Sequence, residues 1–254
     1  METLLWNNDN WIKEDKELLP KRRVDNKISW QRPHIIGSFY SRKMKRIIEY
    51  HSLNECLFYY FLEVDVSTIR YYVQPIEVPI PFISKNGERK YWLHVPDVVV
   101  FRKGYMPLLY QIKESPEDLG DKFHLCNKYC GKMAVLKGWK YDVIYPKTLP
   151  KDVINNIQFL QGYLRERSLY SSIRTDVLFK VIVHGSMSVA DLSHSFPSYS
   201  AADIKPFLYH LIATGEVEIN MNEPISQFTV IKLKGSAATS PLNDLYELAF
   251  GTKE

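Results

Sequence analysis

The feature that most restricts the fold is a pair of apolar runs on either side of a short turn. The stretch VPDVVVFRKGYMPLLYQIKES, residues 95–115, has one run at 98–101 and another at 108–110, with the turn at 102–105 between them. Apolar runs bounded by a glycine-containing turn predict two buried strands joined as a hairpin. A hairpin centred near Gly104 pairs residues whose numbers add up to about 208. The chain therefore has to build a sheet around this hairpin.

Polar side chains interrupt the hairpin at its open end. The pairing places Asp97 opposite Gln111, and Gln111 and Lys113 project from one face because side chains alternate along a strand. A carboxylate, an amide oxygen and an ammonium group on one platform suit Mg²⁺, which prefers oxygen ligands and keeps several waters. A plain cross-strand ion pair between Asp97 and Lys113 is the alternative. The position of Asp97 directly after Pro96, at a strand entry, favours a site.

Further elements are expected before the hairpin. Apolar residues at helical spacing, with Ser52 as an N-cap, predict a helix over 53–62. Residues 68–83 are rich in β-branched and aromatic side chains but contain three prolines, which predicts an edge or bulged strand. The Asn-Gly pair at 86–87 predicts that this strand pairs with the one leading into Asp97.

The hairpin is followed by a second helix and a last strand of the same core. The helix is expected from Asp121 to near Gly138, and residues 139–146 form a short strand. The predicted order is helix, three strands, helix, strand. We therefore expect an α/β core of about 100 residues with mostly antiparallel pairing where the loops are short.

The C-terminal part follows a different pattern. Residues 152–167 predict a helix that leads out of the core, and residues 188–220 alternate two short helical patterns with a turn. Strand-forming residues at 227–234 follow a loop at 222–226. Helix, turn, helix and β-ribbon is the layout of a winged helix-turn-helix. Pro206 predicts that the second of these helices begins near Asp203 or is kinked.

Composition limits the cellular setting. The 254 residues carry a net charge of +4, and basic residues gather over 21–46 against a lone Asp25, which predicts a basic arm or a solvated surface segment. An odd set of three cysteines and the absence of a signal peptide predict a reducing cytoplasm. No apolar run approaches the roughly 18 residues of a membrane span, so a soluble protein is expected. His124, Cys126 and Cys130 supply only three ligands without a CxxC pair, so zinc is not expected.

The residues of the hairpin resemble a known family. Pro96-Asp97 followed by Gln111-Ile112-Lys113, on this order of elements, resembles the PD-(D/E)XK nuclease superfamily and within it the TnsA endonucleases of heteromeric bacterial transposons. That family tolerates glutamine where the superfamily has an acid. The segments GSFYSRKMKR, SLNE and LEVDVSTIRYYVQP are further points of likeness. The resemblance covers about residues 34–150 and implies a restriction-endonuclease-like core, a mixed central sheet flanked by helices, followed by a C-terminal winged-helix domain.

The resemblance also implies a domain division and a set of site residues. The expected divisions are an N-terminal arm at 1–33, an endonuclease domain at 34–150, and a helical linker, winged-helix domain and tail at 151–254. The implied catalytic residues are Glu55, Asp97, Gln111 and Lys113. Mg²⁺, for which Mn²⁺ would substitute, would be held by Glu55, Asp97, Gln111 and the carbonyl of Ile112, with one or two ions bound.

Two points about these acids stay open. Ser52-Leu53-Asn54-Glu55 also fits a capping box in which Glu55 bonds back to the Ser52 amide. Glu63 and Glu77 are second choices as acidic ligands. The helix after the Gln111 strand has no carboxylate beyond Asp121, which leaves a second metal ion open.

The implied activity is hydrolysis of DNA at the 5′ ends of a transposon, while a TnsB-type transposase cuts the 3′ ends and a TnsC-type ATP-dependent regulator docks on the C-terminal region. Only Lys205 and His210 are basic in the expected recognition helix, which favours docking over DNA reading there. A stand-alone restriction or repair nuclease and a non-catalytic DNA-binding scaffold are the alternatives. Candidate DNA contacts are Arg22, Arg23, Arg42, Lys43, Lys45, Arg46, Arg102 and Lys103.

Overall fold

The computed structural model describes residues 10–22, 37–117 and 120–233. The chain divides into two compact units, one of residues 1–58, 67–147 and 252–254 and the other of residues 59–66 and 148–251. No helix in these described ranges combines the length and the hydropathy that a membrane span needs. The protein is of the mixed α/β type, and each unit has its own sheet.

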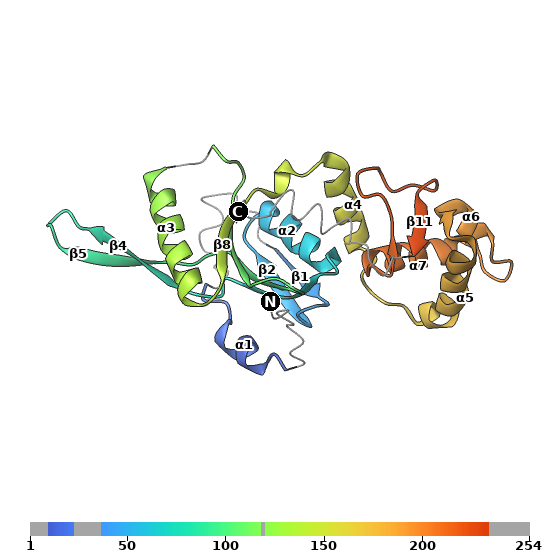
Figure 1. Cartoon of the computed structure of the whole chain (residues 1–254), viewed down its shortest axis with the longest axis horizontal. Coiled ribbons are helices and arrows are strands. Elements are labelled where there is room, and N and C mark those ends of the chain that lie inside the picture. The colour runs from blue at the N-terminus through green and yellow to red at the C-terminus, as the bar shows by residue number, and fades with distance from the viewer. Residues whose placement is uncertain (1–9, 23–36, 118–119, 234–254) are drawn as a thin grey trace. The chain divides into compact units, whose positions relative to one another are not determined.

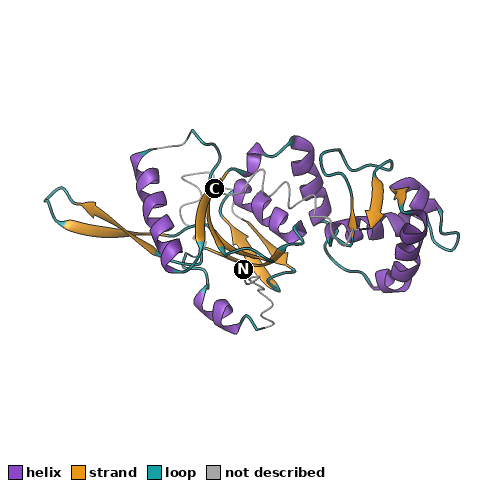
Figure 2. Cartoon of the chain, viewed as in Figure 1, coloured by secondary structure: helices purple, strands orange, loops and turns teal. Residues whose placement is uncertain are grey.

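A four-stranded mixed sheet forms the centre of the first unit (Figures 1 and 2). Its order is β3-β6-β7-β8, with bounds Thr68–Val73, Val98–Arg102, Leu108–Ile112 and Lys140–Ile144. The pairs β3–β6 and β6–β7 are antiparallel and β7–β8 is parallel. Val98 lies opposite Tyr110, so the predicted register of the central hairpin is confirmed.

Helices cover both faces of this sheet. α2 (Leu53–Val64) begins against one face, where the ring of Phe58 meets that of Tyr110 edge to face at 5.6 Å. α3 (Asp121–Leu136) covers the opposite face, where Tyr141 on β8 donates to Asn127 at 2.7 Å. Successive side chains of a strand point to opposite faces, which is why Gln111, next to Tyr110, points to the α3 side. Both helices and the last strand agree with the sequence prediction.

The prediction of one strand over 68–83 is wrong. This stretch forms β3 and then β4 (Val78–Ile83), which pairs with β5 (Arg89–His94) in a separate two-stranded ribbon. The chain leaves the central sheet at Gln74, whose φ of 49° is left-handed, and proline follows at 75. The predicted turn at Gly87 is confirmed, with a φ of 80°. The strand expected to lead into Asp97 is likewise divided into β5 and β6, so five strands stand where three were predicted.

The segment predicted as an N-terminal arm is partly built into the first unit. α1 (Ile12–Glu17) begins after Trp11, which is buried and meets Phe101 of β6 edge to face at 5.2 Å. Asp15 forms an ion pair with Arg70 of β3 at 3.1 Å. β1 (Gly37–Ser41) and β2 (Arg46–Tyr50) form a hairpin that sequence analysis did not predict. Part of the basic segment is therefore strand and turn rather than a loose arm.

The second unit contains most of the remaining helices and a three-stranded sheet. After a 3-10 turn at Pro146–Thr148, its elements are α4 (Lys151–Gln161), α5 (Ser168–His184), β9 (Ser186–Ser188), α6 (Val189–His194), α7 (Ala201–Ala213), β10 (Val217–Glu218) and β11 (Val230–Leu233). The sheet order is β10-β11-β9. The predicted helix over 152–167 ends early, at Gln161, and α5 was not predicted.

The start of the last helix lies two residues from the predicted position near Asp203. α7 begins at Ala201, where Ser200 caps it by accepting a hydrogen bond from the Asp203 amide. Pro206 lies inside the helix in its second turn. The missing amide of a proline removes only one bond there, and the cap compensates for part of that loss.

Candidate active site

Asp97 stands immediately before β6 and is joined to β7 by its side chain. Its Oδ2 accepts a hydrogen bond from the Ile112 amide at 2.6 Å and another from Nε2 of Gln111. Gln111 is 8% exposed, so this contact lies in the interior at the rim of the sheet. The predicted pairing of Asp97 with Gln111 is confirmed in the arrangement of their side chains.

Glu55 occupies the first turn of α2 and is also 8% exposed. Its amide donates to Ser52 Oγ at 3.2 Å, as a capping box requires, and Ser52 Oγ donates to its carboxylate at 3.2 Å. The other carboxylate oxygen accepts from the amide of His51 at 2.9 Å rather than from the predicted Ser52 amide. Capping and metal binding are compatible because a carboxylate offers about four lone pairs.

The charge of Glu55 reaches Asp97. Burial raises the pKa of Asp97 to about 8, and repulsion from the Glu55 carboxylate is the second largest cause of this rise. The Ile112 amide, Lys113 and Arg22 act in the opposite direction and lower that pKa. Two carboxylates are thus held close together in a partly dehydrated place, where a bound cation would relieve their repulsion.

Lys113 follows the end of β7 and is half-buried. Its Nζ lies 5.4 Å from the centre of the Phe123 ring on α3, and its charge lowers the pKa of Asp97. The fold therefore brings the four predicted residues, Glu55, Asp97, Gln111 and Lys113, to one place in the first unit.

The amide of Gln111 is turned differently from what a metal ligand needs. Its nitrogen faces Asp97, and its Oε1 lies 2.9 Å from Nε2 of His94, the last residue of β5. The oxygen of Gln111 can approach a metal shared with Asp97 only after the amide rotates by about half a turn. Sequence analysis did not identify His94, because a single histidine three residues before an aspartate matches no motif. Burial lowers the pKa of His94, although its bond to Gln111 raises it.

A second missed residue, Gln74, connects the parts of the site. Its amide donates to the Asp97 carbonyl at 2.7 Å, and its carbonyl accepts from the Lys21 amide at 2.9 Å. Its side-chain nitrogen lies 3.2 Å from Nδ1 of His51, whose amide binds Glu55. A left-handed backbone conformation is unusual for glutamine and costs about 1 kcal/mol or more. The hydrogen bonds around Gln74 must therefore maintain this conformation.

The donor set fits a hard cation. Glu55 and Asp97 provide two carboxylates, and within the described ranges no third histidine, cysteine, aspartate or glutamate joins them, so any further ligands would be a backbone carbonyl, an amide oxygen or water. The amide and carbonyl of a strand residue point to the same side, so the Ile112 carbonyl faces the Asp97 side with its amide. The Asp97 amide donates to the Tyr110 carbonyl at 3.0 Å, so the ladder does not continue in register past Val98, and the Ile112 amide bonds the Asp97 side chain rather than a backbone carbonyl. Two carboxylates, a carbonyl and water are a typical Mg²⁺ environment.

The second-choice acids occupy other places. Glu63 is buried eight residues beyond Glu55 on α2, about 12 Å along the helix axis. Glu77 is exposed just before β4. On α3, His124 is exposed whereas Cys126 and Cys130 are buried, and burial raises the pKa of Cys130 to about 12.

Arg102 must be removed from the candidate DNA contacts. It is 1% exposed, and its guanidinium lies 4.8 Å from the centre of the Tyr105 ring. Its neighbour Lys103 is exposed in the same turn, as predicted. Arg22 is exposed and close enough to lower the pKa of Asp97, whereas Arg23 lies outside the described residues.

The four cations of the β1–β2 turn fall into two groups. Arg42 and Lys45 are exposed. Lys43 is half-buried and donates to the Thr68 carbonyl at 2.8 Å, and the half-buried Arg46 lies 5.5 Å from the centre of a tyrosine ring of β3. Lys43 and Arg46 therefore hold the hairpin against the central sheet, which makes them weaker candidates for phosphate contacts.

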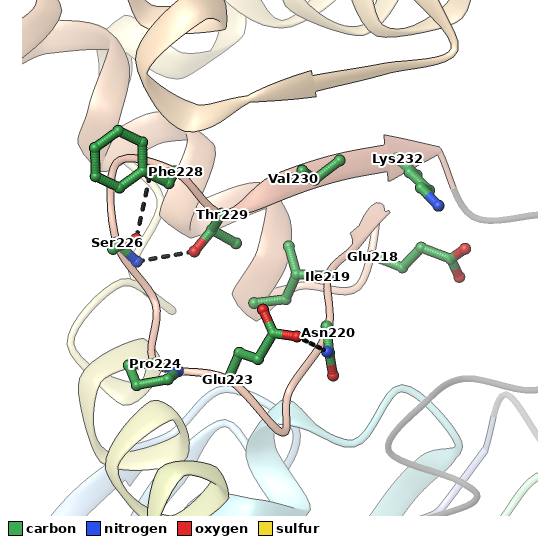
Figure 3. A pocket seen from close by; sticks show the side chains of 10 residues that line it. All are labelled: Glu218, Ile219, Asn220, Glu223, Pro224, Ser226, Phe228, Thr229, Val230 and Lys232. Atoms are coloured by element: carbon green, nitrogen blue, oxygen red, sulfur yellow. Dashed lines mark hydrogen bonds between the residues drawn. The ribbon is translucent and has the colours of Figure 1, made fainter.

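The hollow and the predicted recognition helix of the second unit present few positively charged side chains that could contact phosphate. An open hollow of about 480 Å³ lies along β10, β11 and the loop between them (Figure 3). Asn220 donates to Glu223 at 2.7 Å across its floor, and its charged side chains are Glu218, Glu223 and Lys232. His210, one of the two basic groups predicted for the recognition helix, is buried and bonds the Tyr163 carbonyl at 2.8 Å.

Comparison with models of known protein families gives no match, and none of the curated proteins matches the chain. Any proposal about function therefore has to be argued from the side chains around Asp97.

Proposed function

We propose that the protein is a Mg²⁺-dependent endodeoxyribonuclease of the TnsA kind, with a restriction-endonuclease-like core and a winged-helix C-terminal unit. The observation that carries this proposal is the convergence of Glu55, Asp97, Gln111 and Lys113 at the open end of the β6–β7 hairpin. Its role is to nick the 5′ ends of a transposon while a TnsB-type partner cuts the 3′ ends.

The chemistry divides among these side chains. Asp97, Glu55 and the Ile112 carbonyl would hold a Mg²⁺ ion, and rotation of the Gln111 amide would add a further oxygen. The ion would supply charge neutralisation at the phosphodiester and a lowered pKa for an attacking water. Lys113 orients the water or offsets negative charge on the scissile phosphate. No covalent intermediate is needed.

The second unit serves, in this proposal, to dock a TnsC-type ATP-dependent regulator. Two observations support docking over DNA reading. The hollow along β10 and β11 is lined by two acids, Glu218 and Glu223, and by one lysine, Lys232, and His210 is buried. On α5, Phe179, Ile182 and Val183 are about 60% exposed at helical spacing, which is typical of a contact surface.

Cleavage of strand-labelled DNA that carries transposon ends tests the activity, with Mg²⁺ or Mn²⁺ and with or without a candidate transposase. Asp97→Ala should abolish 5′-strand nicking, and Lys113→Ala should slow it by about 100 to 1,000-fold. Asp142→Ala, beside Tyr110 on the opposite face of the sheet, and Lys140→Ala, at an exposed strand start, are matched controls and should retain it. Full activity in either site variant would remove that residue from the mechanism.

The same assay separates the two alternatives. Nicking at full rate without any transposase would favour a stand-alone restriction or repair nuclease. DNA binding with no metal-dependent cleavage under any condition would favour a non-catalytic scaffold.

A further inference from the structure

The β4–β5 ribbon stands apart from the central sheet of the first unit. Six residues of each strand pair, from Val78 opposite His94 to Ile83 opposite Arg89. Figures 1 and 2 show the ribbon extending past α3, away from the central sheet. An isolated two-stranded ribbon is only marginally stable in water, so we ask which ligand or partner the exposed part of the ribbon contacts.

The two faces of the ribbon differ in what covers them. On the inner face, Ile80 is fully buried and Nζ of Lys122 on α3 lies 5.4 Å from the centre of the Trp92 ring. On the outer face, Ile83, Tyr91 and Leu93 are 73%, 66% and 59% exposed. Side chains alternate along each strand, so these three belong to one apolar strip.

Strand addition by a partner protein is disfavoured along β4. Pro79 and Pro81 provide no amide hydrogen to an incoming strand, and prolines of this kind protect exposed sheet edges. The outer strip is therefore left for contact through side chains.

The tip of the ribbon is positively charged. Lys85, Arg89 and Lys90 are all exposed, and the single acid, Glu88, pairs with Lys90 at 3.0 Å. A two-stranded ribbon fits a DNA groove, cations at its tip attract phosphate, and apolar side chains can be inserted between base steps. Charge complementarity thus favours duplex DNA as the occupant.

The base of the ribbon is joined to the candidate active site. His94 ends β5 and its Nε2 lies 2.9 Å from Oε1 of Gln111. We infer that the β4–β5 ribbon is a DNA-binding arm that grips duplex DNA beside the scissile phosphate. This inference rests on the proposed nuclease function and identifies the surface that holds its substrate.

The test measures equilibrium binding of a labelled duplex by the full chain in EDTA, by fluorescence anisotropy at several salt concentrations. The double variant Lys85→Ala, Arg89→Ala should bind at least tenfold more weakly at low salt, and the slope of log K against log [salt] should fall by about 2, since each phosphate contact contributes about 0.9. Tyr91→Ala should weaken binding with an unchanged slope. The control, Lys13→Ala with Lys16→Ala on α1, also removes two exposed cations and should leave both quantities unchanged.

Binding and cleavage separate the two proposals. If the wild type binds DNA through the ribbon but never nicks it, the DNA-binding arm stands and the nuclease function fails. If the wild type nicks DNA and the ribbon variants match it in affinity and salt slope, the arm is refuted. Loss of transposase binding with unchanged DNA binding would also refute it, since the strip would then be a protein contact.

Discussion

Replacement of Asp97 by asparagine should stabilise the metal-free protein at alkaline pH. Asparagine keeps an oxygen that can accept hydrogen bonds from Ile112 and Gln111, but it removes the charge that burial and Glu55 oppose. Because the pKa of Asp97 is raised to about 8 when folded, the folded protein retains a proton that the unfolded chain releases from about pH 4 upwards.

The sign and size of the effect follow from linkage. Below about pH 4 the carboxyl is protonated in both states and has no effect on the free energy of unfolding. As the pH rises to about 8 the wild type loses stability, and above that the loss is complete. At about 1.4 kcal/mol for each pKa unit, a rise from 3.8 to about 8 sets an upper bound of about 5 to 6 kcal/mol. Relaxation and water penetration reduce it, so we expect a gain of about 2 to 5 kcal/mol for Asp97→Asn at pH 9.

Urea unfolding followed by tryptophan fluorescence measures this gain. The three tryptophans among the described residues, Trp11, Trp92 and Trp139, belong to the first unit, so their signal reports the unit that contains Asp97. Mg²⁺ at 100 times its Kd should stabilise the wild type by about 2.7 kcal/mol and leave Asp97→Asn unaffected.

The control is Asp142→Asn. Burial also raises the pKa of Asp142, but its position beside Tyr110 puts it on the opposite face of the sheet. This variant should gain some stability at high pH and keep the full response to Mg²⁺. A gain below about 0.5 kcal/mol for Asp97→Asn at pH 9, or an equal response to Mg²⁺ in all three proteins, would refute the electrostatic account of the site.

Three further outcomes are expected. Lys113→Ala should slow nicking by about 100 to 1,000-fold with little change in the Kd for DNA, since its charge acts on the transition state; a binding titration in EDTA beside single-turnover nicking separates these effects. Arg102→Ala should lower the free energy of unfolding by about 2 to 4 kcal/mol, because the guanidinium is buried, and should leave the salt dependence of DNA binding unchanged; a reduced salt slope would restore Arg102 as a phosphate contact. Phe179→Ser combined with Val183→Ser should weaken the pull-down of a TnsC-type ATPase without altering nicking, and an unchanged pull-down would count against docking on α5.

The centre of the fold could be predicted because one turn sets the register of two strands. With Gly104 as the turn, simple counting places Val98 opposite Tyr110, as in the structure, and brings the Gln111 side chain to Asp97, to which its Nε2 donates. α3 carries an equally clear sequence signal, since it begins at Asp121 and ends just before Gly138, whose φ is 71°.

The elements that were missed lack such signals. The β1–β2 turn has neither glycine nor asparagine, and Lys45 adopts a φ of 52° because Met44 and Lys43 are held against β3 by tertiary contacts. On α5, buried Val177 lies two residues from exposed Phe179, and apolar residues on both faces conceal the helical pattern. The contact of His94 with Gln111 depends on how the ribbon joins the sheet, which no local pattern encodes.

Gln74 sets a limit on how the two carboxylates of the candidate site, Glu55 and Asp97, can move. Its backbone is bonded to Lys21, in the segment after α1, and to Asp97, immediately before β6, and its side chain reaches His51, whose amide binds Glu55. A displacement of the chain at Lys21 is therefore transmitted to both acids through one rigid corner. The distance between Glu55 and Asp97 therefore depends on the chain at Lys21 as well as on the sheet. Substitutions near Lys21 should change which cation these two carboxylates bind.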